Sequence, residues 1–328
     1  MTTREILERF RRLSVLVVGD ICLDRWCTYD PAAADPSRET GIPRVGVTET
    51  KVTPGAGGTV ANNLAALGAG RVAVLGAIGA DGFGWDLTQA LTKRGIEPDL
   101  LVEAYELQTF TYTKLLNVST GEEDLPRVDF INLRELPARV EEGVVQRIEA
   151  HAAEFDIIMV SDQAETHQGG VVTAPVRDAV SRLAAGSPSK IFWVDSRLRP
   201  ELFRGVIVKP NRDEAEAACR RLPTGADFRA LHRHIGGPFL VVTHGPDGVL
   251  IVTDEGEIRL RTRAVERPVD ICGAGDSFSA GAALALAVTG SPREAARIGN
   301  LVASVTIMKK GTGTATPAEV LEAEARQG

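Results

Sequence analysis

An aspartate and a glycine-rich turn in the last quarter of the chain have the residue types and spacing that phosphoryl transfer needs. The segment from Asp270 to Asp276 reads Asp-Ile-Cys-Gly-Ala-Gly-Asp and leads into an apolar stretch. Small residues at a helix start let a phosphate approach unpaired N–H groups and the positive end of the helix dipole. Asp276 would face that anion and accept a proton from an attacking hydroxyl. A packed turn with a dipole-stabilising aspartate is the alternative interpretation.

Three other polar motifs precede this segment. Asp24 ends Gly-Asp-Ile-Cys-Leu-Asp after a β-branched run, and is either a ligand-binding carboxylate or a turn residue. Asn211 and Glu214 have the spacing of a helix capping box, which is compatible with a second role near a metal or phosphate. The segment 243–248, Thr-His-Gly-Pro-Asp-Gly, is by itself typical of a glycine-rich hairpin turn.

Together these motifs resemble the ribokinase-like carbohydrate kinases, also called the phosphofructokinase B type. The Asp-x-x-Gly-Ala-Gly-Asp core matches the family's C-terminal signature completely, and the other motifs follow in the family's order over about residues 15–317. The resemblance implies that Asp276 is the catalytic base and that Asp24 binds sugar hydroxyls. It also implies an anion hole formed by the amides of Gly273, Ala274 and Gly275.

The same resemblance implies ATP as the phosphoryl donor, with Mg²⁺. Asn211 and Glu214 match the family's Asn-x-x-Glu motif, which positions Mg²⁺ and phosphate largely through water. The other implied nucleotide-binding positions are Thr243, Gly245, Gly248 and, on the helix that lines the adenine pocket, Asn300. Family members often hold a monovalent cation beside the anion-hole turn. Asp270 and residues 311–314 correspond to that site, so K⁺ is a further candidate.

The acceptor side departs from the usual family pattern. Residues 54–69 resemble the family's glycine loop and following helix, but Thr59 stands where many members carry an asparagine that contacts the sugar. A threonine hydroxyl has one hydrogen-bond donor, whereas an asparagine amide has two. The sugar hydroxyls that Thr59 can bind should therefore differ from those that the asparagine binds. The expected acceptor-binding residues are Asp24, Glu39, Gly55, Gly57, Gly58, Thr59, Asn63, Lys114 and Arg127.

Within the family, the chain is similar to the heptose-phosphate kinase part of ADP-heptose synthase. The similarity rests on residues 19–25, 38–43, 113–114, 127–129 and 161–162. Arg38, Lys114 and Arg127 are suited to pair with a phosphate on the substrate, and solvated surface charge is their alternative interpretation. The acceptor is therefore expected to be a sugar or a sugar phosphate.

Three other functions compete with this expectation. A nucleoside kinase of the same fold would need a base pocket, for which Trp26, Phe110 and Tyr112 are available. A catalytically silent regulator that binds sugar or nucleotide is favoured by the change at Thr59 and disfavoured by the intact Asp276. A dinucleotide-dependent dehydrogenase ranks last, because no Gly-x-Gly-x-x-Gly follows the first strand.

The elements that must position these residues alternate between strand and helix, which predicts an α/β fold with a mostly parallel sheet covered on both faces. We expect strands at residues 14–19, 71–77, 156–160, 190–194, 205–208 and 239–243 and a hairpin at 249–261. Helices are expected at 57–67, 83–94, 137–153, 171–185, 212–222, 274–288, 292–308 and 317–325. Residues 1–328 are interpreted as one kinase domain. Two proline-broken stretches, about 21–52 and 100–132, should form a small β-lid, with exposed strands such as 43–47.

Composition narrows the class of partner. The 328 residues carry a net charge of −7 without a long basic run, which disfavours nucleic-acid binding. The four cysteines have neither zinc nor disulfide-framework spacing, and the apolar run at 15–18 is too short for a signal peptide or a membrane span. We therefore expect a cytoplasmic enzyme that acts on a small molecule, without nucleic acid or membrane. Exposed lid strands would offer a surface for a homodimer.

Overall fold

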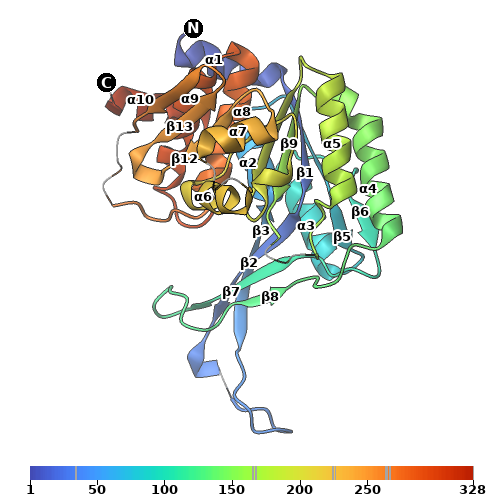
Figure 1. Ribbon diagram of the computed structural model, residues 1–328. Helices are drawn as coiled ribbons and strands as arrows, with labels where there is room; N and C mark the ends of the chain where they lie inside the picture. The colour runs from blue at the N-terminus through green and yellow to red at the C-terminus, as the bar shows by residue number, and fades with distance from the viewer. Residues whose placement is uncertain are drawn as a thin grey trace.

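An eight-stranded sheet runs through the centre of the protein (Figure 1). The computed structural model describes residues 1–33, 35–164, 166, 168–223, 225, 227–262, 265 and 267–327. Six strands are parallel, in the spatial order β4-β1-β9-β10-β11-β12, and β13 and β14 continue the sheet as an antiparallel hairpin. The bounds are β1 Ser14–Gly19, β4 Arg71–Leu75, β9 Ile157–Asp162, β10 Ile191–Ser196, β11 Ile207–Val208, β12 Leu240–Thr243, β13 Val249–Thr253 and β14 Gly256–Leu260.

Alternating side chains of the central strands build a core on each face of this sheet. In β1, Val15 and Val17 belong to one buried cluster, and Leu16 and Val18 belong to the other. Strands that are apolar on both faces are expected where helices cover both sides of a parallel sheet. The first cluster takes side chains from α1 (Thr3–Arg9), α2 (Gly57–Ala66), α3 (Gly82–Thr92), α8 (Ala274–Thr289), α9 (Pro292–Thr306) and α10 (Pro317–Gln327). The second takes them from α4 (Ala138–His151), α5 (Ala174–Gly186), α6 (Arg212–Arg221) and α7 (Phe228–Ile235).

Helix α8 is the most deeply buried helix that bears on the candidate site. Its residues 277–286 are all buried, which its sequence permits because it is almost entirely alanine, leucine, glycine and serine. A helix that is apolar all round is stable only inside a core. The hydroxyls of Ser277 and Thr306 lie 2.8 Å apart and tie α8 to α9. The N-terminus of α8 is therefore held firmly at the carboxyl edge of the sheet.

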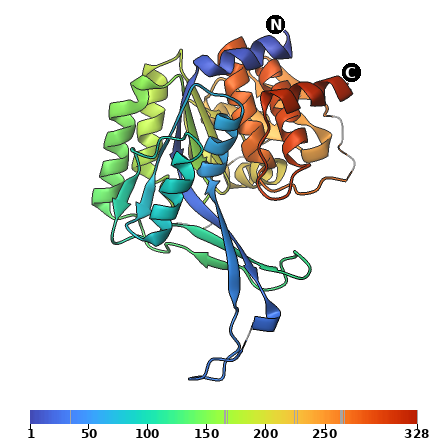
Figure 2. The same cartoon turned by 180° about the vertical axis from the view of Figure 1, so that it is seen from behind.

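A second, four-stranded sheet has the order β3-β2-β7-β8 and projects away from the main body (Figure 1). It comprises β2 (Ile21–Tyr29), β3 (Val47–Ala56), β7 (Thr111–Asn117) and β8 (Val128–Phe130). The hairpin of β2 and β3 extends furthest from the body. Both chain termini lie at the opposite end, where α1 contacts α8 and α10 (Figure 2). Among the described residues, no helix combines the length and apolar character needed to cross a membrane.

The ribbon departs from the expected elements at four places. Segment β6 (Val102–Ala104) pairs with β5 (Ala77–Gly79) in a separate two-stranded sheet, so it is not part of the projecting sheet. Residues 43–46 are not in a strand, and β3 begins only at Val47. Helix α7 was not expected, because its eight residues are short for a periodic signal. Helix α5 starts at Ala174 rather than at 171, since the amide of Val171 is bonded to Asp20.

Candidate active site

Two cavities meet at the N-terminus of α8. The larger, about 650 Å³, extends from the carboxyl ends of β10 to β12 along α8 and α9. The smaller, about 170 Å³, lies between the central sheet and the projecting sheet. Four residues line both cavities: Gln163, Arg197, Gly273 and Asp276. A group bound in one cavity is therefore next to a group bound in the other, which is the arrangement that transfer between two ligands requires.

The expected anion-hole turn lies at this junction. Gly273 is the N-cap of α8 and has a left-handed backbone, with φ of 76°, which glycine adopts without steric cost. Ala274 and Gly275 form the first helical turn and line the larger cavity. The N–H of Ala274 donates to the carbonyl oxygen of Ile271 at 3.2 Å. The first N–H groups of a helix have no partner within it, so the turn still presents the positive dipole end of α8 to an anion.

Asp276 is the carboxylate closest in sequence to that turn. Burial, followed by the negative charge of Asp195, raises the pKa of Asp276 to about 7, although Lys209 and Arg197 act in the opposite direction. Part of the Asp276 side chain remains open to the two cavities. A carboxylate with a pKa near neutrality is well matched to accept a proton from a hydroxyl.

A buried ion pair beneath the turn was missed from the sequence. Lys209 follows β11 directly, Asp195 lies in β10, and Nζ of Lys209 is 2.9 Å from Oδ2 of Asp195. Burial disfavours the ammonium charge, but the carboxylates of Asp195, Glu214 and Asp276 outweigh it and raise the pKa of Lys209. A β-carbon on Gly275 would lie 3.5 Å from this Nζ. The positive charge thus lies behind the anion-hole turn. A lysine two residues before Asn211 was the available signal.

The residues expected around the nucleotide all line the larger cavity: Asn211, Glu214, Thr243, Gly245, Gly248 and Asn300. Asn211 and Glu214 form a complete capping box at α6, with N–H to oxygen distances of 2.9 and 2.8 Å. Burial, then Asp195, raises the pKa of Glu214. The described residues contain no cluster of three or more acidic, cysteine or histidine side chains that could hold a metal directly.

The smaller cavity contains the expected acceptor residues Asp24, Thr59, Lys114 and Arg127. Asp24 lies in the middle of β2, opposite Thr53 of β3. Burial raises the pKa of Asp24 to about 6, against the charges of Lys114 and Arg127. Thr59 is buried in the first turn of α2, and its hydroxyl is 3.3 Å from the carbonyl oxygen of Pro54.

Cationic side chains outnumber carboxylates around this cavity. Arg25, Lys114, Arg127 and Arg197 line it, beside the carboxylates of Asp24 and Asp276. The guanidinium of Arg25 lies 4.7 Å over the ring of Phe83, and its Nε has no hydrogen-bond partner among the described atoms. Lys114 lies 4.6 Å over the ring of Trp26, and its Nζ is 3.9 Å from Glu123. Arg127 is paired with Asp129 at 2.7 Å. The lining itself still holds more cations than carboxylates, which favours an anionic ligand.

Several expected acceptor residues do not line the cavity. Glu39 and Arg38 are exposed in a turn of the projecting hairpin, because the chain between β2 and β3 runs away from the body. Asn63 is fully buried and donates to the carbonyl oxygen of Thr59 at 3.0 Å, so it supports α2 from within. The remaining three are Gly55, Gly57 and Gly58, which are buried behind the cavity wall.

One of these glycines has a clear indirect role. A β-carbon on Gly55 would lie only 2.4 Å from Oδ1 of Asp24. The glycine therefore leaves the space in which that carboxylate lies. Phe110, expected as part of a base pocket, is buried against Cys22 and Ala164 and does not line the cavity.

Asp270 lies outside both cavities and connects two loops. Its Oδ1 accepts the N–H of Cys272 at 2.9 Å, and its Oδ2 accepts the N–H of Gly311 at 3.0 Å. The sequence had paired Asp270 with residues 311–314, and the structure brings these segments together. Asp270 thereby fixes the start of the anion-hole turn against the loop that follows α9.

Comparison with solved structures identifies the fold. Phosphofructokinase-2 from Escherichia coli in complex with potassium aligns with a TM-score of 0.69 at 19% identity, covering 96% of this chain and 99% of that one. Ribokinase from Arabidopsis thaliana complexed with ribose and ATP aligns with a TM-score of 0.65 at 19% identity, covering 95% and 98%. The expectation of a ribokinase-like α/β fold is confirmed.

Sequence comparison identifies the family. The bifunctional protein HldE of Trichlorobacter lovleyi is 28% identical over 324 residues, which are 97% of this chain and 64% of that protein. This chain thus spans less than two thirds of that relative's length. The family model for pfkB family carbohydrate kinases matches residues 13–319, a range that includes the whole central sheet and α8. The chain therefore belongs to the pfkB family of carbohydrate kinases.

Proposed function

We propose that this carbohydrate kinase transfers the γ-phosphoryl group of ATP to a hydroxyl of a sugar phosphate. ATP would occupy the larger cavity and the acceptor would occupy the smaller one. The observation that carries the proposal is the position of Asp276, which lines both cavities at the N-terminus of α8.

The proposed chemistry follows from that position. The acceptor oxygen forms a bond to the γ-phosphorus, the bond from that phosphorus to the β,γ-bridging oxygen breaks, and ADP leaves. The hydroxyl proton passes to the carboxylate of Asp276. The amides at the start of α8 and the ammonium of Lys209 stabilise the negative charge on the transferring group. Closure of the projecting sheet over the acceptor would exclude water and limit ATP hydrolysis.

Two cations complete the proposal. A magnesium ion carried by the nucleotide phosphates would neutralise their charge, and Glu214 and Asn211 fit it through water. The raised pKa of Glu214 reflects burial and a nearby carboxylate, an environment in which a cation is favourable. A potassium ion would lie beside the Asp270 loop. Phosphofructokinase-2 from Escherichia coli, which has the same fold, was solved in complex with potassium.

The charge around the smaller cavity supports a phosphorylated acceptor. Four cations and two carboxylates line this cavity, and the pKa values of these carboxylates are raised to about 6 and about 7. Two of the cations, Lys114 and Arg127, also pair with carboxylates outside the lining. The resemblance to the heptose-phosphate kinase branch agrees with this class of acceptor. A neutral nucleoside fits less well, since Phe110 is buried elsewhere and Trp26 and Tyr112 are already covered by Lys114 and Arg127. A catalytically silent regulator is the second alternative. Release of ADP that depends on an acceptor would exclude it.

We also propose that the reaction takes place in the cytoplasm, where ATP is available. All four cysteines of the chain are free thiols, which is usual for proteins kept in a reducing compartment. Recovery of the protein from the soluble cytoplasmic fraction of its source cells would support this assignment, and recovery from outside the cell would contradict it.

The substrate class and the role of Asp276 are tested together. ADP release is measured with Mg-ATP and a panel of free sugars, sugar phosphates including heptose 7-phosphate, and nucleosides. Asp276→Asn should lower kcat by roughly 10²–10⁴ while ATP binding is retained, because only proton transfer is lost. Glu294→Gln is the matched control, since Glu294 is a first-turn carboxylate of α9 that lines neither cavity. Near-full activity of Asp276→Asn would refute the mechanism.

The raised pKa of Asp276 predicts a pH dependence of both activity and stability. The base must be ionised, so kcat/KM should rise with pH and level off above about 7. Between the unfolded value of 3.8 and about 7, the folded state holds a proton that the unfolded state releases, so this group lowers stability as pH rises. The Tm of Asp276→Asn should therefore exceed that of the wild type at pH 8 and approach it at pH 4. An unchanged Tm difference across this range would contradict the burial of the charge.

Variants of the cationic residues that line the smaller cavity test whether they bind a phosphate group of the acceptor. Arg25→Met and Lys114→Met should each raise KM for a sugar phosphate by about 10–100-fold, the equivalent of a lost charged hydrogen bond. KM for the matching free sugar should change by less than about threefold. Arg233→Met removes an exposed arginine of α7 that lines neither cavity and is the control. Equal effects on both acceptors would remove the proposed phosphate contact.

We further propose a homodimer formed through the projecting sheet. Strand β3 is an edge strand whose residues 47–51 are exposed, and the apolar side chains of Ile42, Val45 and Val47 are exposed in or next to it. Val128 and Ile131 are exposed at the opposite edge, in or next to β8. Unpaired strand edges with apolar side chains favour pairing with a second copy. Sedimentation velocity should show a dimer that Val47→Lys weakens. A monomer at micromolar concentration would exclude this arrangement.

A further inference from the structure

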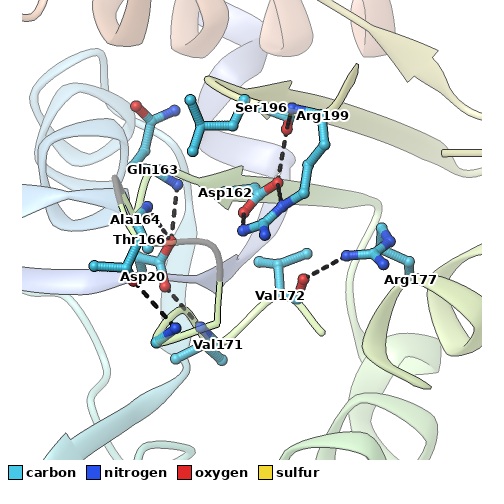
Figure 3. A network of polar contacts seen from close by, with 12 residues as sticks. Asp20, Asp162, Gln163, Ala164, Thr166, Val171, Val172, Arg177, Ser196 and Arg199 are labelled. Atoms are coloured by element: carbon cyan, nitrogen blue, oxygen red, sulfur yellow. Dashed lines mark hydrogen bonds and ion pairs between the residues drawn. The ribbon is translucent and has the colours of Figure 1, made fainter. Parts of the chain in front are cut away.

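Asp20, a buried carboxylate that lines neither cavity, holds three backbone N–H groups of one loop (Figure 3). Its Oδ2 accepts from Gln163 at 2.8 Å and from Ala164 at 2.7 Å, and its Oδ1 accepts from Val171 at 2.8 Å. The loop between β9 and α5 therefore starts and ends on the same side chain. Burial, then the charge of Asp162, raises the pKa of Asp20 to about 6, so above that pH the three bonds to its carboxylate are charge-assisted.

The backbone of the same residue holds the other wall of the smaller cavity. The carbonyl oxygen of Asp20 accepts the N–H of Gly57, the first residue of α2, at 2.9 Å. Its own N–H donates to the carbonyl oxygen of Ser161 at 3.0 Å. The approach of β1 to β9 is very close here, since a β-carbon on Gly19 would lie 2.1 Å from the Ser161 oxygen. Asp20 is therefore held rigidly between the two walls.

Each wall supplies a side chain to the smaller cavity. Thr59 projects from the first turn of α2, and Gln163 leads the loop that Asp20 holds. Gln163 is also one of the residues shared with the larger cavity. The position of Asp20 thus determines the separation of two cavity residues that are far apart in the chain.

The neighbouring carboxylate continues this frame on the other side. Asp162 binds Arg199, with 2.6 Å from Nη2 to Oδ1, and accepts the hydroxyl of Ser196 at 2.6 Å (Figure 3). The carbonyl oxygen of Asp162 accepts the N–H of Arg197 at 3.0 Å. Arg197 and Gln163, which both line the two cavities, are consequently placed by adjacent parts of one buried polar network.

We propose that Asp20 is a positioning residue for phosphoryl transfer, which fixes Gln163 at the junction of the two cavities by binding the amides of Gln163, Ala164 and Val171. The inference rests on the proposed kinase function. Asp20 does not touch the ligands; it acts through the loop. An asparagine at this position tests the role, because an amide offers only one accepting atom and at least one of the three N–H groups must lose its acceptor.

The experiment compares Asp20→Asn, Gln163→Ala and the double variant, assayed well below their Tm with the best acceptor of the panel. Asp20→Asn should lower kcat/KM by roughly 10-fold. The double variant should lose no more than about twofold beyond the worse single variant, because both changes remove the same contribution. A purely structural role would not produce this non-additivity.

Asp156→Asn is the matched control. Its carboxylate also links β1 to β9, since it accepts the N–H and the hydroxyl of Ser14 at 2.9 and 2.8 Å. Asp156 lies at the amino ends of these strands, away from the cavities. This variant should lower Tm while kcat/KM stays within about twofold of the wild type. A loss equal to that of Asp20→Asn would show a general stability effect and overturn the proposal.

The remaining outcomes distinguish failure of the proposed role of Asp20 from failure of the proposed kinase function. Full activity of Asp20→Asn or Gln163→Ala, or additive losses in the double variant, overturns the role of Asp20 while leaving the kinase function intact. An inactive wild type removes the proposed function itself. If Asp20→Asn does not fold, hydrogen exchange of the wild type decides: the amides of Ala164 and Val171 should exchange at least about 10²-fold more slowly than exposed loop amides. Fast exchange at these amides overturns the proposal.

Discussion

The N-terminus of α8 must be open to ligands while the rest of the helix is buried. Residues 277–286 are enclosed by the core, so α8 cannot shift without disturbing it. This restraint holds the turn of Gly273, Ala274 and Gly275, and the positive end of the α8 dipole, at one fixed point. An anion bound there is stabilised by dipoles that need no reorganisation, which is the main source of electrostatic catalysis. The two cavities, and the position of Asp276 between them, follow from where this helix begins.

Positive and negative side chains nearly balance one another beside the N-terminus of α8. Asp195 neutralises Lys209, and Lys209 and Arg197 oppose the negative charge of Asp276. Removing water from this group of charges makes each one sensitive to its neighbours. Burial therefore raises the pKa of Asp276 to about 7, which weakens the folded state at higher pH and suits the proposed role as a base. Stability and the proposed role make opposite demands on this carboxylate.

The acceptor side is built differently. The smaller cavity is bounded on one side by the carboxyl ends of β1 and β9, which Asp20 and Asp162 hold in place. The projecting sheet bounds it on the other side. Arg25 and Lys114 stand on strands of that sheet and lie over aromatic rings, so the cations that favour a phosphate belong to the less enclosed part of the molecule. If the projecting sheet closes against the carboxyl ends of the central strands, as proposed, water is excluded from the acceptor site.

The sequence by itself determined the fold class, the order of the elements and the residues that gather around the larger cavity. Those features depend on local signals: hydrophobic period, the capping pair Asn211 and Glu214, and a contiguous glycine turn. Tertiary structure alone decided which residues meet across the chain. Lys209 with Asp195, and Asp20 with the loop 163–171, are paired by the parallel order of strands far apart in sequence, which no local spacing encodes. For the same reason, local spacing did not place Glu39 and Asn63. Glu39 lies in the connection of β2 and β3, away from the body, and Asn63 is buried and bonded to the carbonyl oxygen of Thr59.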